Sequence, residues 1–201
     1  MKANSIIRSE ALAVLRGNWG SAVLLCLVYT ILVGIVGAVG SSIMVPFIAW
    51  FVQPVLAIGL ILAFLGLIRD GKRLELNSLF SAFNKTYYWK SIGVMLLSFL
   101  YTFLWTLLLI IPGIIKSLSY SLAMYIVADE PEIGYDEAIE KSMAMMDGHK
   151  MQLFLMTLHF LLIGLLCVLT LGIGFLWGVP YMQAVTANFY LAVRDKQQVE
   201  A

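Results

Sequence analysis

Two stretches of this chain lack charged residues over far more than the length of one membrane-crossing helix. Residues 17–68 and 151–193 contain no Asp, Glu, Lys or Arg. A helix needs about 20 apolar residues to cross about 30 Å of hydrocarbon. Each stretch therefore has the length of two membrane-spanning helices, which constrains the chain to fold within a lipid bilayer.

The composition agrees with a bilayer environment. Of the 201 residues, 61% are hydrophobic and 12% are charged, whereas a typical soluble domain has about 25% charged residues. The net charge of +1 gives no global basic field for nucleic acid. The length favours a single integral membrane domain, residues 1–201.

Helix-breaking residues divide each long stretch near its middle. Gly40, Ser41, Ser42 and Pro46 interrupt the first, and residues 170–174 interrupt the second. The predicted spans are residues 19–39, 44–68, 151–169 and 173–193. They form two hairpins with tight, uncharged turns.

The middle of the chain gives one clear span and one doubtful one. Residues 92–111 form a span that Pro112-Gly113 is expected to end. Residues 113–128 are a candidate sixth span, although residues 114–128 would be only about 22 Å long as a helix. The segment also contains Lys116 and three serines, so it either crosses the bilayer or stops short.

The distribution of Lys and Arg favours six spans, because loops rich in these residues stay in the cytoplasm. With six spans, 12 of the 13 Lys and Arg residues lie on one side, whereas five spans divide them 8 to 5. We therefore predict both termini in the cytoplasm. A cleavable signal peptide is the competing interpretation of the first span, but 18 residues precede it and we favour a retained anchor.

A short amphipathic segment precedes each predicted hairpin. The three segments are residues 4–16, 76–84 and 135–147, and their apolar residues recur at helical spacing. Helices of this kind lie in the membrane interface. The predicted fold is thus an all-α membrane protein with six transmembrane helices in three hairpins, each preceded by a cytoplasmic interface helix. This order amounts to a threefold parallel repeat.

Several local motifs resemble a known bacterial family. They lie at residues 15–19 (LRGNW), 111–116 (IPGIIK), 128–131 (ADEP), 138–142 (AIEKS), 148–150 (GHK), 169–174 (LTLGIG) and 179–184 (VPYMQA). In this order they resemble the membrane family called domain of unknown function 975. The resemblance implies an integral protein of the bacterial cytoplasmic (inner) membrane, and it brings no activity, ligand or catalytic residue.

Polar residues within the predicted spans are the candidate site residues. Lys116 is the most unusual, since a charge within a span is costly, but it can also snorkel to the far interface. The whole candidate intramembrane polar site comprises Lys116, Ser117, Tyr120, Ser121, Gln53, His159, Gln183 and Asn188. These side chains line a polar cavity in one interpretation and form interhelical hydrogen bonds in the other.

Nothing in the sequence predicts a catalytic centre. Cys26 and Cys167 lie in apolar runs without CxxC spacing, and there are only two histidines. No hydrolase, metalloprotease or nucleotide-binding motif occurs, and we expect no metal or cofactor. The acidic residues Asp129, Glu130 and Glu132 lack calcium-loop spacing and are expected in a solvated turn.

These features favour a membrane scaffold, regulatory or interaction protein that presents its cytoplasmic helices. The expected partners are the lipid bilayer, a membrane or cytoplasmic protein, and a second copy of the chain. The alternative is a small transporter or channel that uses the polar faces of spans two, four and six. A membrane-embedded enzyme acting on lipids ranks third, and we expect no enzymatic activity.

The charge distribution makes a testable prediction about topology. Reporter fusions after Lys90, Lys150 and Ala201 should report the cytoplasm, because almost all Lys and Arg residues then share that side. Fusions at Ser42 and Gly172 should report the outside. A reporter at Lys150 that is found outside would refute six spans.

Overall fold

The computed structural model describes residues 2–39 and 46–200, and every regular element within these residues is helical. Helices α2 and α3 form the first hairpin, α4 and α5 the middle hairpin, and α8 and α9 the last hairpin. The elements are α1 (Asn4–Leu15), α2 (Trp19–Val39), α3 (Pro46–Asp70), the 3₁₀ helix η1 (Leu76–Phe80), α4 (Lys85–Leu108), α5 (Ile110–Tyr120), α6 (Ala123–Asp129), α7 (Tyr135–Met145), α8 (Lys150–Leu169) and α9 (Phe175–Glu200).

Five segments within the described residues are long and apolar enough to cross a membrane. They are Trp19–Ala38, Phe51–Asp70, Thr86–Leu108, Ile110–Asp129 and Lys150–Leu169. The predicted sixth span forms part of α9 but is not among them, because Pro180, Gln183 and Asn188 reduce its hydropathy. The chain is therefore an all-helical membrane protein, and the six-span arrangement stays a prediction.

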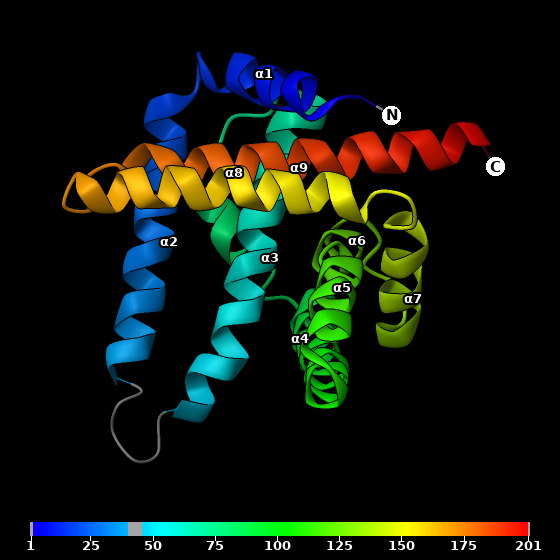
Figure 1. The fold of residues 1–201 in the computed structure, drawn as a ribbon. Helices are drawn as coiled ribbons and strands as arrows, with labels where there is room; N and C mark the ends of the chain where they lie inside the picture. Colours follow the sequence, from blue (N-terminus) through cyan, green and yellow to red (C-terminus); the bar gives the residue numbers. More distant parts are fainter. Residues whose placement is uncertain (1, 40–45, 201) are drawn as a thin grey trace.

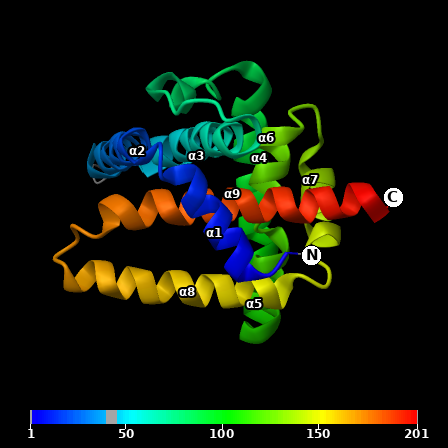
Figure 2. The same cartoon turned by 90° about the horizontal axis from the view of Figure 1, so that it is seen from above.

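Three helix pairs extend from a common centre in three different directions. In Figure 1, α2 and α3 run downward, while α8 and α9 run across them to the left. The pair α4 and α5 is seen almost end-on in Figure 1 and lengthwise in Figure 2. The pairs thus spread apart toward their connecting turns instead of forming a parallel bundle.

Large side chains fill the centre where the three pairs meet. Phe64, Phe189 and Tyr190 are almost completely buried, and the ring centroids of Tyr125 and Tyr190 lie 5.5 Å apart. The outer turns are the opposite: Leu171 is 95% exposed, and Leu107, Ile111 and Leu169 are also exposed. Such a large apolar surface is typical of a region covered by lipid.

The first and third surface segments pack against the hairpins through small and apolar residues. α1 buries Ile7, Ala11 and Leu15, and it lies across α9 (Figure 2). α7 buries Ala138, Ile139 and Ser142 and contacts α4, α5 and α6. Both helices therefore bury one face against the membrane domain.

The second surface segment departs from the expected helix over residues 76–84. Only the five-residue η1 forms. Of the apolar residues expected along one face of the segment, only Leu79 is buried. Leu76, Phe80 and Phe83 are exposed. The helix stops because the Asn84 side chain accepts a hydrogen bond from the Tyr87 backbone N–H and so begins α4.

The middle hairpin also corrects two predicted boundaries. The turn lies at Leu109, so the expectation that Pro112-Gly113 ends the third span is wrong. Pro112 fits the first turn of α5, where its missing N–H has no helical partner to lose. The segment 113–128 is likewise not one helix, because α5 ends at Tyr120 and α6 begins at Ala123.

The predicted turns of the outer hairpins have different outcomes. The turn at residues 170–174 is confirmed, with Leu171 and Gly172 at positive φ (55° and 88°) between α8 and α9. The predicted break around Gly40, Ser41 and Ser42 lies outside the described residues, which resume at the first residue of α3, Pro46.

Close packing at Gly59 gives a stability prediction. A Cβ atom at Gly59 would lie 2.3 Å from the Leu79 carbonyl oxygen, so Gly59→Ala should separate α3 from η1. Overpacking of this kind costs about 1–3 kcal/mol, measurable as a lower midpoint of thermal unfolding in detergent. Gly164→Ala is the matched control, since no atom lies within 4 Å of that Cβ position. Equal stability of the two variants would contradict the packing.

Candidate functional site

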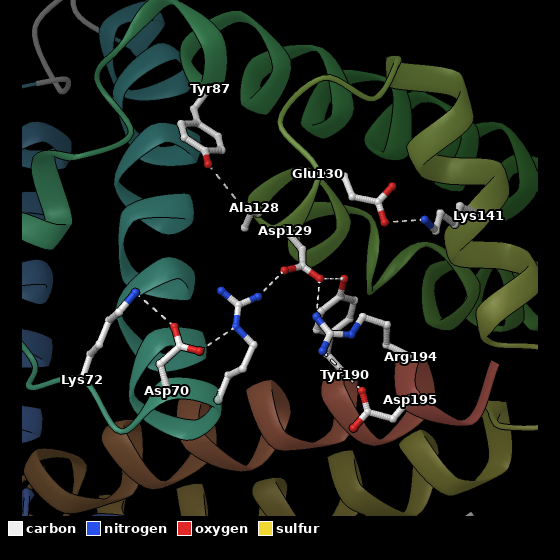
Figure 3. A network of polar contacts seen from close by, with 11 residues as sticks. Asp70, Lys72, Tyr87, Ala128, Asp129, Glu130, Lys141, Tyr190, Arg194 and Asp195 are labelled. Carbon is white, nitrogen blue, oxygen red and sulfur yellow. Dashed lines mark hydrogen bonds and ion pairs between the residues drawn. The ribbon is translucent and has the colours of Figure 1, made fainter. Parts of the chain in front are cut away.

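A largely buried carboxylate joins the inner ends of the three hairpins (Figure 3). Asp129, at the end of α6, accepts from Arg69 Nη1 at 2.7 Å through one oxygen. Its other oxygen accepts from Arg194 Nη1 at 2.6 Å and from the Tyr190 hydroxyl at 3.0 Å. Asp129 therefore links α3, α6 and α9 in one polar cluster, which we call the Asp129 junction.

Further ion pairs extend the Asp129 junction toward the surface. Arg69 also contacts Asp70 at 3.1 Å, and Arg194 contacts Asp195 at 3.3 Å. Only 11% of the Asp129 side chain is exposed, compared with 44% for Arg69 and 20% for Arg194. Solvent thus screens the Arg194 pair less than the Arg69 pair.

The expectation of a solvated turn is wrong for Asp129. A signal for its role existed in the sequence: Arg69-Asp70, Asp129-Glu130 and Arg194-Asp195 each end the apolar part of a hairpin's second arm. Because the inner ends of the three hairpins converge, residues at these positions meet. Glu130 forms an ion pair with Lys141 of α7 and is only partly buried.

Lys116 lies in a pocket between α4, α5 and α7. Its Nζ is 5.1 Å from the centre of the Trp105 ring and 3.7 Å from Met143 Sδ. Tyr120, Asp136 and further residues complete the lining: Tyr101, Ile139 and Glu140. The ammonium therefore turns toward the acidic helix α7, and two carboxylates share its pocket.

The predicted serines of α5 do not face this pocket together. Ser117 and Ser121 are exposed, and each donates a hydrogen bond to a carbonyl of its own helix. Tyr120 is buried. Local bonds of this kind satisfy the hydroxyls without requiring a polar cavity.

A serine of α7 that is not among the predicted site residues pairs with backbone groups at the break between α5 and α6. Ser142 of α7 is fully buried. Its Oγ donates to the Ser119 carbonyl oxygen at 2.7 Å and accepts from the Leu122 backbone N–H at 3.2 Å. One hydroxyl thus pairs two backbone groups that the interrupted helix leaves free.

The remaining candidates are dispersed. His159 Nε2 lies 3.4 Å from the Tyr181 hydroxyl, between α8 and α9. Gln53 is exposed, and Gln183 is half-buried. Asn188 is buried and donates to the Ile7 carbonyl at 2.9 Å. The structure therefore brings Lys116 and Tyr120 together and leaves the others apart.

Asn188 also takes part in fixing α1. Its Nδ2 lies 3.1 Å from Glu10 Oε2, and Lys2 Nζ lies 2.7 Å from Glu10 Oε1. The Lys2 hydrogen bond lowers the pKa of the Glu10 carboxyl, against the effect of burial and with help from Asn188. The carboxyl is therefore ionised at neutral pH and binds both donors.

The polar residues described above form hydrogen bonds and ion pairs with one another and with the backbone. Within residues 2–39 and 46–200, no three His, Cys, Asp or Glu side chains form a group that could hold a metal ion. His159 faces a tyrosine hydroxyl, and Cys26 and Cys167 are free and buried. Polar clusters among the described residues include the Asp129 junction, the Lys116 pocket and the group of Lys2, Glu10 and Asn188.

These observations define an all-helical membrane protein with converging hairpins. The family described as Protein of unknown function (DUF975) matches residues 1–116 and 106–197. The chain belongs to this family, as its motifs predicted. Neither the curated proteins nor the solved structures contain a match.

The Asp129 junction predicts a large effect of a nearly isosteric change. Asp129→Asn removes the charge that pairs with both arginines and leaves Arg194 poorly compensated. Breaking such a partly buried pair costs about 2–4 kcal/mol, seen as a lower unfolding midpoint in detergent. Asp147→Asn is the control, because the Asp147 side chain is 87% exposed. An unchanged midpoint for Asp129→Asn would show that the junction adds no stability.

Proposed function

We propose that this chain is a non-enzymatic scaffold or interaction protein of the bacterial inner membrane. In the proposed topology all three hairpins begin and end on the cytoplasmic side and α9 is the sixth span. This topology requires α8 and α9 to tilt toward the direction of α2 and α3 from their orientation in Figure 1. The cytoplasmic loops and surface segments α1, η1 and α7 then form the face that a protein partner binds. The partner is a membrane or cytoplasmic protein, or a second copy of the chain.

The observation that carries the proposal is the closure of the centre by the Asp129 junction. Ion pairs and large side chains occupy the place where three hairpins would have to surround a conduit. Phe64, Phe189 and Tyr190 lie there without appreciable exposure. A packed centre of this kind supports a rigid platform more than a transport path.

The polar residues of the predicted spans also favour a platform. A path through spans two, four and six would need their polar side chains to converge. Instead Ser121 binds its own helix, Gln53 is exposed, and Asn188 holds α1. Bonds of this kind are the ordinary interhelical and local bonds of membrane proteins.

The surface segments carry exposed charged residues that a protein partner would bind. Arg73 and Glu75 are exposed between α3 and η1, and Glu132 is exposed before α7. Charges placed around apolar groups give specificity and fast association to protein interfaces. Exposed Phe80 and Phe83, whose ring centroids lie 6.2 Å apart, are the apolar part of this surface.

Complementation of a deletion strain separates the platform from a transporter. Charge reversal on the cytoplasmic face, Arg73→Glu or Glu132→Lys, should abolish complementation at normal membrane abundance, because neither residue packs in the core. Removing interior polar groups, Gln183→Leu and Ser121→Ala, should leave complementation intact. Membrane abundance is measured for every variant.

The opposite pattern would count against the proposal. A transporter would lose activity with Gln183→Leu or Ser121→Ala at normal abundance and would tolerate both charge reversals. Arg73→Lys serves as the charge-preserving control and should complement fully.

A further inference from the structure

The pocket around Lys116 has the two opposite poles that a dipolar ligand needs. It is an open pocket of about 440 Å³ formed by α4, α5 and α7, and its carboxylates Asp136 and Glu140 are exposed. Lys116 of α5 supplies the positive pole, and Asp136 and Glu140 of α7 supply the negative pole. Tyr101 and Trp105 of α4 form an aromatic wall. The poles therefore come from different elements.

These opposite charges share a pocket without neutralising each other. Among the described residues, Lys116 forms no ion pair, and its Nζ contacts only the Met143 sulfur and the Trp105 ring face. A thioether is a weak acceptor, so ammonium protons of Lys116 are left for a ligand. Glu140 is likewise in no ion pair of the described chain, although nearby Lys141 pairs with Glu130.

We propose that this pocket binds a phosphoethanolamine group, with its phosphate on Lys116 and its primary ammonium on Glu140 and Asp136. Lysine binds phosphate oxygens through charge-assisted hydrogen bonds. An ammonium with three N–H donors matches the two carboxylates, whereas a trimethylated ammonium has none to donate. A purely anionic group would lie next to Glu140 and be repelled.

Side chains around the two poles fit this orientation. The Tyr101 hydroxyl donates to Asp136 Oδ1 at 3.2 Å and fixes that carboxylate at the pocket wall. Beyond the aromatic wall, toward the turn at Leu109, α4 exposes Leu104 and Leu108. These exposed leucines offer an apolar surface next to the pocket that acyl chains attached to the bound group would contact.

Two sources can supply this chemistry: the headgroup of a phosphatidylethanolamine lipid and soluble phosphoethanolamine. The exposed leucines favour the lipid. The pocket lies between the surface helix α7 and the parts of α4 and α5 near their turn at Leu109, and the binding chemistry does not depend on which leaflet supplies the lipid. Binding measurements on purified protein therefore succeed or fail independently of the complementation experiment.

Native mass spectrometry of the full chain in detergent tests the proposal with defined lipids. The protein is mixed with equal amounts of phosphatidylethanolamine, phosphatidylglycerol and phosphatidylcholine of identical acyl chains. We expect phosphatidylethanolamine to be retained about tenfold over the other two, the ratio that about 1.4 kcal/mol gives. A competition arm adds soluble phosphoethanolamine: displacement at equal concentration identifies the soluble source, and no displacement identifies the lipid.

Variants of the two poles assign the binding to this pocket. Lys116→Gln should lower retention of phosphatidylethanolamine about tenfold, and Lys116→Arg should preserve it. Glu140→Gln should remove the preference over phosphatidylglycerol, because it removes the carboxylate that selects the ammonium. Lys90→Gln and Glu132→Gln are matched controls outside the pocket and should behave like the unmodified chain. Thermal unfolding without lipid shows that each variant is folded.

Two results would overturn the proposal. One is equal retention of phosphatidylglycerol and phosphatidylethanolamine by the unmodified chain. The other is an unchanged lipid preference in folded Lys116→Gln and Glu140→Gln. Either result would mean that the two poles of the pocket do not select a phosphate and an ammonium.

Discussion

The pairing of Asp129 with Arg69 and Arg194 is the interaction on which this arrangement of hairpins depends. Each partner ends a different hairpin, so the three charges meet where the inner ends of the hairpins converge. Burying a charge is expensive unless it is paired and hydrogen-bonded. Asp129 has two cations and a hydroxyl, and this compensation lets a carboxylate sit at the centre of an otherwise apolar core.

A junction at one end leaves the hairpins free to spread at the other. The outer turns expose Leu107, Ile111 and Leu171, which water would not tolerate but lipid does. Helices in a bilayer gain little from burying apolar surface against each other. Specific contacts therefore set their geometry, and here these contacts concentrate near the Asp129 junction and beneath α1, η1 and α7.

Sequence periodicity and charge were sufficient for the helical class, the bounds of the first and fifth spans and the turn at residues 170–174, and local motifs were sufficient for the family. They were not sufficient for features that depend on contacts between different helices. The middle hairpin turns at Leu109, where Gly113 of α5 packs closely against Thr106 of α4. In the fourth span, Ser142 of α7 stabilises the break between α5 and α6. Lys116 could be flagged as unusual, but its neighbours Asp136 and Glu140 come from a segment that pattern analysis placed outside the membrane.

The polar residues of this protein are of two kinds, those with a bonding partner in the structure and charged ones without an ion-pair partner among the described residues. Ser121, His159 and Asn188 have partners that account for them, and a polar residue with a satisfied bond needs no further role. Lys116 and Glu140 differ, since each carries a charge into a shared pocket without an opposite charge of its own. Lys116 is partly buried and Glu140 is exposed, so solvent keeps the cost of these unpaired charges small. Their opposite signs make the contact between α5 and α7 the place where a dipolar ligand would act on the fold.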